Sequence, residues 1–162
     1  MSGDGSGVPL LDLFVYGTLM RAWSGHYANL LHANADFMGE ASVNGRLYDL
    51  VRFPGAVFDA GERSEVLGEL FRLKGTWLLD ELDAYEACRP RDPLPHLFRR
   101  CVVQVKAGQT STAAWAYELT GAGKARAVRV IPTGRFRRAC RYARPEIVTV
   151  AISGGTRKRT GR

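Results

Sequence analysis

The chain has 162 residues, of which 46% are hydrophobic and 10% aromatic, so one domain with a substantial core is predicted and wholesale disorder is excluded. The net charge of +7 is uneven: residues 121–162 hold twelve Lys/Arg and one acid, giving +11, whereas residues 1–120 hold eleven Lys/Arg and fifteen acids, giving −4. No apolar run reaches about 18 residues and the Gly/Ser-rich start lacks an apolar stretch, so neither a membrane span nor a signal peptide is predicted.

The cysteines and histidines give no sign of a metal site. The three cysteines are an odd number without metal-like spacing: Cys88, Cys101 and Cys140. Reduced thiols in a cytoplasmic protein are the simplest interpretation. None of the three histidines lies at ligand spacing from another, so a zinc site is not expected.

The first informative stretch covers residues 14–20. It begins as a strand of alternating residues and breaks at Gly17, after which Thr18 is predicted to cap a helix that runs to about Leu31. A strand, a glycine turn and a helix start would place free N–H groups at one end of a sheet. Such groups suit a carboxylate, a phosphate or a developing oxyanion. A strand-to-helix turn without chemistry is the alternative.

Further along the chain, alternating patterns and turn residues predict a series of strands. Residues 36–43 are predicted to end in a turn at Asn44-Gly45, with residues 46–51 as the hairpin partner. The other predicted strands lie at residues 56–58, 66–73, 98–106, 111–119 and 146–152. Residues 121–124 read as a loop that lacks the spacing of a phosphate-binding loop.

Domain boundaries follow from composition. Residues 1–9 are predicted to be a flexible N-terminus and residues 10–144 a single domain. Residues 145–162 are predicted to be a basic C-terminal extension that is partly disordered, since residues 153–162 hold no apolar side chain to anchor them.

The most informative helix is predicted over residues 77–86, with Thr76 at its N-cap. Glu86 follows Leu79 by seven residues and Leu82 by four, so it projects between two leucines of the buried face. Burial of a carboxylate raises its pKa toward neutrality and suits it to accept and return a proton. The alternative is a last-turn glutamate that turns out to solvent.

A second acid, Glu69, competes for the same role. It shares its strand face with Leu67 and Phe71 and is therefore expected to be partly buried. A structural ion pair with Arg72 or Arg52 is the reading that the sequence favours.

Six short motifs, in their order along the chain, resemble the gamma-glutamylcyclotransferase-like proteins, a group that includes gamma-glutamylamine cyclotransferases and plant avirulence-induced relatives. The resemblance runs from about residue 11 to about residue 138. The motifs lie at residues 14–19, 45–50, 53–55, 67–71, 82–86 and 98–100.

The resemblance implies a mixed α/β (α+β) fold with a small central β-barrel flanked by short helices. It also implies that the loop of Tyr16, Gly17, Thr18 and Leu19 holds the glutamyl end of a substrate through main-chain N–H groups. Glu86 is implied to be the proton-transferring residue, at the position that the helical spacing singles out.

The implied reaction is cleavage of a gamma-glutamyl amide by the substrate's own α-amine, which releases 5-oxoproline and a free amine. The implied partner is a small gamma-glutamyl compound, with no cofactor, metal or membrane, and the oligomeric state stays open. Three departures from the family pattern bear on the substrate: Ala87 replaces a usual Gly, Phe98 a common Tyr, and Arg135-Phe136 a frequent Asp-Trp.

A hypothesis of a different class is a catalytically idle binding module of the same fold. Its basic C-terminal region would hold nucleic acid or another polyanion. Phe136 and Tyr142 are the only aromatic residues among those arginines, so this hypothesis ranks second and a nucleic-acid contact is not the favoured expectation.

Overall fold

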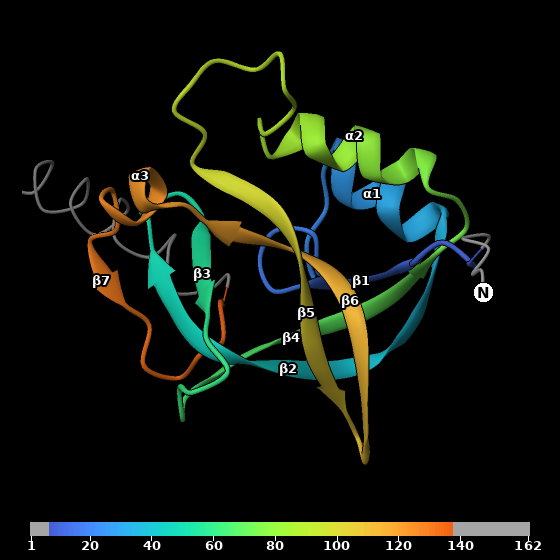
Figure 1. The fold of residues 1–162 in the computed structure, drawn as a ribbon, viewed down its shortest axis with the longest axis horizontal. Helices are drawn as coiled ribbons and strands as arrows, with labels where there is room; N and C mark the ends of the chain where they lie inside the picture. Colours follow the sequence, from blue (N-terminus) through green and yellow to red (C-terminus); the bar gives the residue numbers. More distant parts are fainter. Residues whose placement is uncertain (1–6, 138–162) are drawn as a thin grey trace, which may run out of the picture.

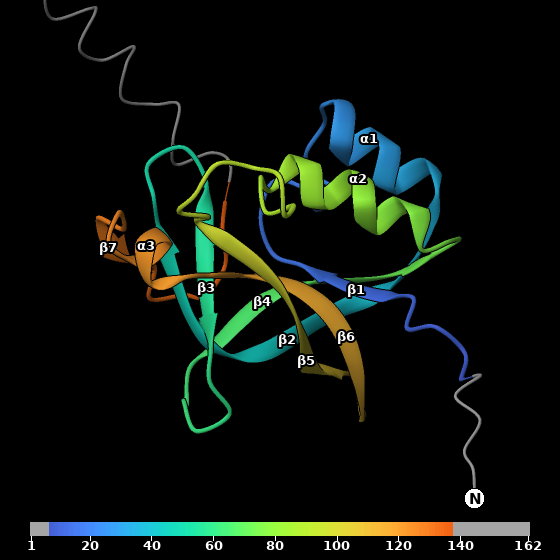
Figure 2. The same cartoon turned by 45° about the horizontal axis from the view of Figure 1, so that its top comes forward.

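The computed structural model describes residues 7–137, which form a mixed α+β fold around a closed β-barrel (Figures 1 and 2). The strands are β1 Asp12–Val15, β2 Ala35–Asp49, β3 Pro54–Phe58, β4 Glu65–Leu73, β5 Phe98–Ala107, β6 Thr110–Leu119 and β7 Arg129–Val130. The helices are α1 His26–Ala33, α2 Trp77–Tyr85 and α3 Gly121–Lys124. The expected fold class is therefore confirmed.

Five strands close the barrel. Around the ring, β2 pairs with β4, β4 with β1, β1 with β6, β6 with β5, and β5 again with β2 through Ser42 and Lys106. All of these pairs are antiparallel except β1–β6, which is parallel. Closure leaves no unpaired edge in the ring, which protects a small sheet from pairing with other chains.

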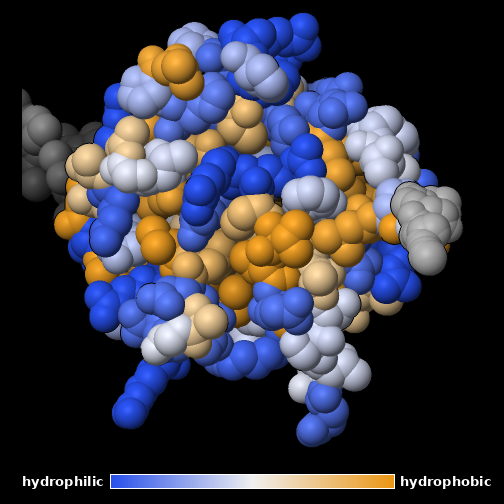
Figure 3. Space-filling view, viewed as in Figure 1, coloured by the Kyte–Doolittle hydropathy of each residue, from blue (hydrophilic) through white to orange (hydrophobic). Residues whose placement is uncertain are grey.

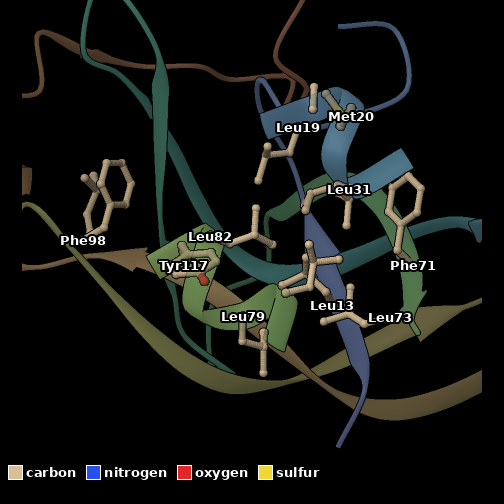
Figure 4. Close-up of a cluster of buried hydrophobic side chains, with 14 of the residues drawn as sticks. Leu13, Leu19, Met20, Leu31, Phe71, Leu73, Leu79, Leu82, Phe98 and Tyr117 are labelled. Carbon is tan, nitrogen blue, oxygen red and sulfur yellow. The ribbon is translucent and has the colours of Figure 1, made fainter. Parts of the chain in front are cut away.

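β1 is buried on both faces because it lies between the barrel interior and the helices. Phe14 belongs to the apolar cluster inside the barrel, whereas Leu13 and Val15 belong to the cluster that the helices cover. In Figure 4, Leu13 of β1 lies near Leu79 of α2 and Leu31 of α1. In both cartoon views α1 and α2 lie side by side over one end of the barrel.

The hairpin predicted at Asn44-Gly45 is wrong, since β2 runs through this position without a turn. Asn44 is the last residue of β2 paired with β4, and Gly45 is the first paired with β3. A Cβ on Gly45 would lie 2.4 Å from the carbonyl oxygen of Val57, so the glycine permits close approach of β3. β3 begins at Pro54, two residues before the strand predicted at residues 56–58.

The helix predicted to begin at Thr18 begins instead at His26. Leu19 and Met20 are buried, as the apolar spacing suggests, but they pack from a series of turns. Those turns include the bond from the Met20 N–H to the Gly17 carbonyl oxygen, at 3.1 Å. Tertiary burial thus accounts for apolar residues that were read as helical periodicity.

The other predicted elements divide into three groups. The strands predicted at residues 66–73, 98–106 and 111–119 and the helix at residues 77–86 are confirmed within a residue or two. Residues 121–124 form a short helix where a loop was predicted. The strand predicted at 146–152 and the C-terminal extension lie outside the described residues, so the predicted domain boundaries stay predictions.

The described surface is mixed in character. Figure 3 shows an apolar band across the middle of the molecule, where β5 and β6 cross in Figure 1, and Val102 of β5 is 52% exposed. Within residues 7–137, no helix is long and apolar enough to cross a membrane.

Candidate active site

A cavity of about 380 Å³ lies where β1 ends, β3 and β5 begin, and α2 ends. This volume falls in the range of small-molecule sites. The lining is largely apolar with a few polar groups, and four segments supply most of it: residues 14–19, 52–54, 85–87 and 95–98. The predicted site residues Tyr16, Gly17, Thr18, Leu19 and Glu86 all line this one cavity.

Glu86 is held in place by the way α2 ends. It is the C-cap residue, and its N–H donates to the Leu82 carbonyl oxygen at 2.9 Å. The next two N–H groups, of Ala87 and Cys88, donate back to the carbonyl oxygens of Ala84 and Asp83 at 3.2 and 3.0 Å. This pair of bonds is the Schellman helix terminus, in which the first residue after the cap adopts left-handed angles. Ala87 has φ +54°, a conformation that glycine adopts without steric cost.

The carboxyl group of Glu86 faces the cavity without a partner. Among the described residues no side chain or main-chain group donates a hydrogen bond to it, and no cation lies at salt-bridge distance. Burial, and secondarily the nearby carboxylate of Asp83, raise the pKa of Glu86 to about 8. The carboxyl group is therefore poised to exchange a proton near neutral pH.

Both carboxylate oxygens of Asp83, three residues earlier, accept hydrogen bonds. Its two oxygens accept bonds from the Nε and an NH2 group of Arg100, at 2.8 and 3.2 Å. The Tyr117 hydroxyl also donates to Asp83, at 2.7 Å. The Arg100 guanidinium in turn lies 4.4 Å from the ring centroid of Trp115. This network ties the last turn of α2 to β5 and β6 and so fixes the wall that carries Glu86.

The loop after β1 offers main-chain N–H donors to the cavity; residues 17–19 are called the donor loop below. In the part of the chain that the structure describes, the N–H groups of Gly17, Thr18 and Leu19 make no hydrogen bond. The loop leads into turns rather than into a helix, so no helix dipole adds to these donors. A Cβ on Gly17 would lie 2.8 Å from Cγ of Pro54. Close packing against β3, rather than unusual backbone angles, therefore requires glycine at this position.

The Tyr16 hydroxyl belongs to the framework. It donates to the Tyr117 carbonyl oxygen at 2.6 Å and accepts from the Ala56 N–H at 3.1 Å, which joins β6 to β3. Burial, and secondarily the charge of Glu86, hold the pKa of Tyr16 well above its usual value, so the phenol stays neutral. Tyr16 thus shapes the cavity, while its main chain leads into the donor loop.

Thr18 and Tyr85 link the two sides of the cavity. The Thr18 Oγ1 and the Tyr85 hydroxyl lie 2.6 Å apart in a hydrogen bond. Tyr85 also packs on Tyr27 of α1, with ring centroids 4.9 Å apart. The donor loop is therefore tied directly to the residue that precedes Glu86.

Glu69, the rival acid, does not line the cavity. Its carboxylate accepts a bond of 2.7 Å from the Arg21 N–H and lies 3.5 Å from the Arg21 Nε. Glu69 forms a structural ion pair, as predicted, but both predicted partners, Arg72 and Arg52, are wrong: the partner is Arg21, and Arg72 pairs with Asp12. The sequence distance of 48 residues between the partners hid this contact.

Several lining residues were not predicted: Arg52, Phe53, Tyr85, His96 and Tyr117. They come from two loops, the last residue of α2 and β6, which only the fold brings together. No spacing in the sequence marks the loop residues as part of a site. Over residues 7–137 no cluster of three or more His, Cys, Asp or Glu could hold a metal ion.

Comparisons with known proteins agree with this geometry. The family model described as gamma-glutamyl cyclotransferase, AIG2-like matches residues 13–138. A crystal structure of an AIG2-like protein from Mus musculus is similar at 25% identity and TM-score 0.55, covering 68% of this chain and 78% of that one. A structure titled gamma-glutamyl cyclotransferase is similar at 13% identity and TM-score 0.53, covering 95% and 93%.

The structure of YkqA from Bacillus subtilis is similar at 20% identity and TM-score 0.59; the match covers 90% of this chain and 43% of that one. At this identity the likeness shows the fold alone. No curated protein matches the chain. The family match covers well over half of the sequence, and the chain belongs to the gamma-glutamyl cyclotransferase, AIG2-like family.

Proposed function

We propose that the protein cleaves a gamma-glutamyl amide by intramolecular cyclisation. The α-amine of the substrate attacks its own γ-carbonyl carbon, the bond to the leaving nitrogen breaks, and 5-oxoproline and a free amine are released. The observation that carries the proposal is the unpaired carboxyl of Glu86, with its raised pKa, in the same cavity as three free main-chain N–H groups.

Glu86 would move the protons. The α-ammonium group must lose a proton before it can attack, and the leaving nitrogen must gain one. The α-ammonium group lies beside a free carboxylate, which holds its pKa above the roughly 8 of a peptide α-amino group. The pKa of Glu86, raised to about 8, lies much closer to that of the ammonium group than an ordinary glutamate would. One carboxyl group can therefore accept the proton and return it. General acid–base catalysis of this kind contributes about 10²–10⁴-fold in rate.

The N–H groups of Gly17, Thr18 and Leu19 would hold the α-carboxylate of the glutamyl group. Main-chain donors to a carboxylate form charge-assisted hydrogen bonds, which are stronger than neutral ones. Fixing that end folds the glutamyl chain back toward its own γ-carbonyl. Holding two reacting groups together in this way contributes up to about 7–11 kcal/mol in favourable cases.

The test is a set of gamma-glutamyl amides incubated with purified protein, with 5-oxoproline and the free amine both quantified. Equal amounts of the two products are expected. Release of glutamate instead of 5-oxoproline would mean that water attacks the amide, which would overturn the cyclisation. The polyanion-binding alternative depends mostly on arginines beyond Arg137, which lie outside the described residues, and stays a prediction.

A further inference from the structure

A strained turn at the rim of the cavity presents Arg52. Val51 has φ +79°, a conformation that a β-branched residue rarely adopts. Three bonds fix the turn: the Arg52 N–H to the Leu50 carbonyl oxygen at 3.0 Å, the Leu50 N–H to the Phe53 carbonyl oxygen at 3.0 Å, and the Val51 N–H to Asp49 Oδ1 at 2.7 Å. Val51 is 60% exposed, so burial of its side chain does not offset the strain.

Strain of this kind persists where the surrounding structure imposes it, and it gathers at functional sites. Here the strained turn sets the position of Arg52. The turn joins β2 to β3, and it places Arg52 on the cavity lining next to Phe53 and Pro54.

Arg52 has no partner in the part of the chain that the structure describes. Among residues 7–137, no carboxylate lies at salt-bridge distance from its guanidinium and no acceptor takes a hydrogen bond from it. Of the described Lys and Arg residues, Arg52 is the one that lines the cavity. Arginines close to the same walls behave differently, since Arg100 is bound by Asp83 and Arg89 by Asp92.

The cavity therefore has two charged side chains without a partner among the described residues: the carboxyl group of Glu86 and, exposed at the rim, the guanidinium of Arg52. Glu86 and Arg52 form no ion pair, and the charge of Arg52 is not among the causes that shift the pKa of Glu86. A substrate that satisfies both must carry an ammonium group and a carboxylate. The glutamyl group supplies the ammonium, and the proposed donor loop already receives its α-carboxylate. The anion for Arg52 then belongs to the leaving amine.

We propose that Arg52 is a specificity residue that binds a carboxylate on the leaving amine, so that the preferred substrates are gamma-glutamyl amino acids or peptides rather than uncharged gamma-glutamylamines. This inference rests on the proposed function, since it names the substrate class of the same cavity. Guanidinium suits the task because its planar N–H groups match a carboxylate in two parallel bonds.

The experiment compares gamma-glutamyl-alanine with gamma-glutamyl-alaninamide, which differ only in the carboxylate. The wild-type protein is expected to favour the carboxylate by about tenfold to hundredfold in kcat/KM, the usual range for a charged hydrogen bond. Arg52→Gln should abolish that preference by raising KM for gamma-glutamyl-alanine with kcat unchanged, and should leave the alaninamide reaction as it is. Arg52→Lys should keep part of the preference.

The control is Arg63→Gln, which removes the same charge from an exposed loop between β3 and β4 that does not line the cavity. It should behave as wild type with both compounds. An equal loss with both compounds in Arg52→Gln would overturn the inference, because Arg52 would then bind the glutamyl end that they share. Absence of any preference in the wild type would also overturn it.

Failure of the proposed function would look different. If neither compound yields 5-oxoproline, the cyclisation is wrong, and calorimetric titration of the same pair still tests Arg52. Tighter binding of gamma-glutamyl-alanine, lost in Arg52→Gln, would keep the anion site. Equal binding of both compounds would show that Arg52 does not bind the carboxylate of the leaving amine.

Discussion

Asp83 and Glu86 lie three residues apart at the end of α2, yet their carboxyl groups differ in hydrogen bonding and in position relative to the cavity. Asp83 accepts bonds from Arg100 and Tyr117, and it holds the helix end against β5 and β6. Glu86 accepts none from any described residue, faces the cavity, and has its pKa raised to about 8. The comparison teaches that a satisfied carboxylate stabilises the wall of a site, whereas an unsatisfied one is available for chemistry.

The sharpest test of this division of roles is Glu86→Gln. The amide keeps the shape of the side chain but cannot exchange a proton, so kcat should fall by about 10²–10⁴-fold with little change in substrate affinity. The measurement is the steady-state rate of 5-oxoproline release. Glu69→Gln is the matched control, since Glu69 is also an acid on the barrel wall but binds Arg21 outside the cavity. Retention of most of kcat in Glu86→Gln would refute the assignment.

Asp83→Asn should act first on stability. It weakens the bonds to Arg100 and Tyr117 and leaves a cation without its partner, so the free energy of unfolding should fall by about 2 kcal/mol. Denaturant unfolding measures this loss. The substitution also removes the negative charge that helps to raise the pKa of Glu86. The part of the pH profile on which kcat/KM rises with pH should therefore move to lower pH. An unchanged profile would show that Asp83 does not influence Glu86.

The pH dependence of stability tests the raised pKa of Glu86 in another way. The folded-state pKa of Glu86, about 8, lies above its ordinary value of 4.5, so between these values the folded protein keeps a proton that the unfolded chain releases. Wild-type stability should therefore fall as pH rises through this window. Glu86→Gln lacks this dependence, and its advantage in Tm over wild type should grow from pH 5 to about pH 8 and then level off. A constant difference across this range would contradict the raised pKa.

The smallest expected effect concerns the cap that positions Glu86. Ala87 adopts φ +54° at the position after the cap, where glycine has no steric penalty. Ala87→Gly should raise the free energy of unfolding by about 1 kcal/mol. Ala84→Gly, inside α2, is the matched control and should lower it by about as much. If Ala87→Gly lowered the free energy of unfolding as much as Ala84→Gly does, the backbone at Ala87 would not be strained.

Local patterns predicted much of this molecule. The bounds of β4, β5, β6 and α2 follow from alternation, helical spacing and adjacent turn residues, which act within a few positions. The inward direction of Glu86 follows from its spacing from Leu79 and Leu82, both buried. These features depend on little beyond the segment that contains them.

The features that could not be predicted depend on contacts distant in sequence. Gly45 resembles a turn residue, yet its role is to admit the carbonyl oxygen of Val57 while β2 changes partners. Leu19 and Met20 have helical spacing, yet they fill the core from a loop. The far wall of the cavity, with Arg52 among its residues, exists only after the barrel closes.

The central claim is that Glu86 is the group that titrates near pH 8 and moves protons in the cavity. Difference infrared spectroscopy of wild type against Glu86→Gln, recorded across pH with a labelled carboxyl carbon, measures the pKa of this group directly. The account predicts a midpoint of about 8 that coincides with the pH midpoint of kcat/KM for 5-oxoproline release. A Glu86 carboxyl that titrates at its ordinary value of 4.5, with activity rising at another pH, would contradict it.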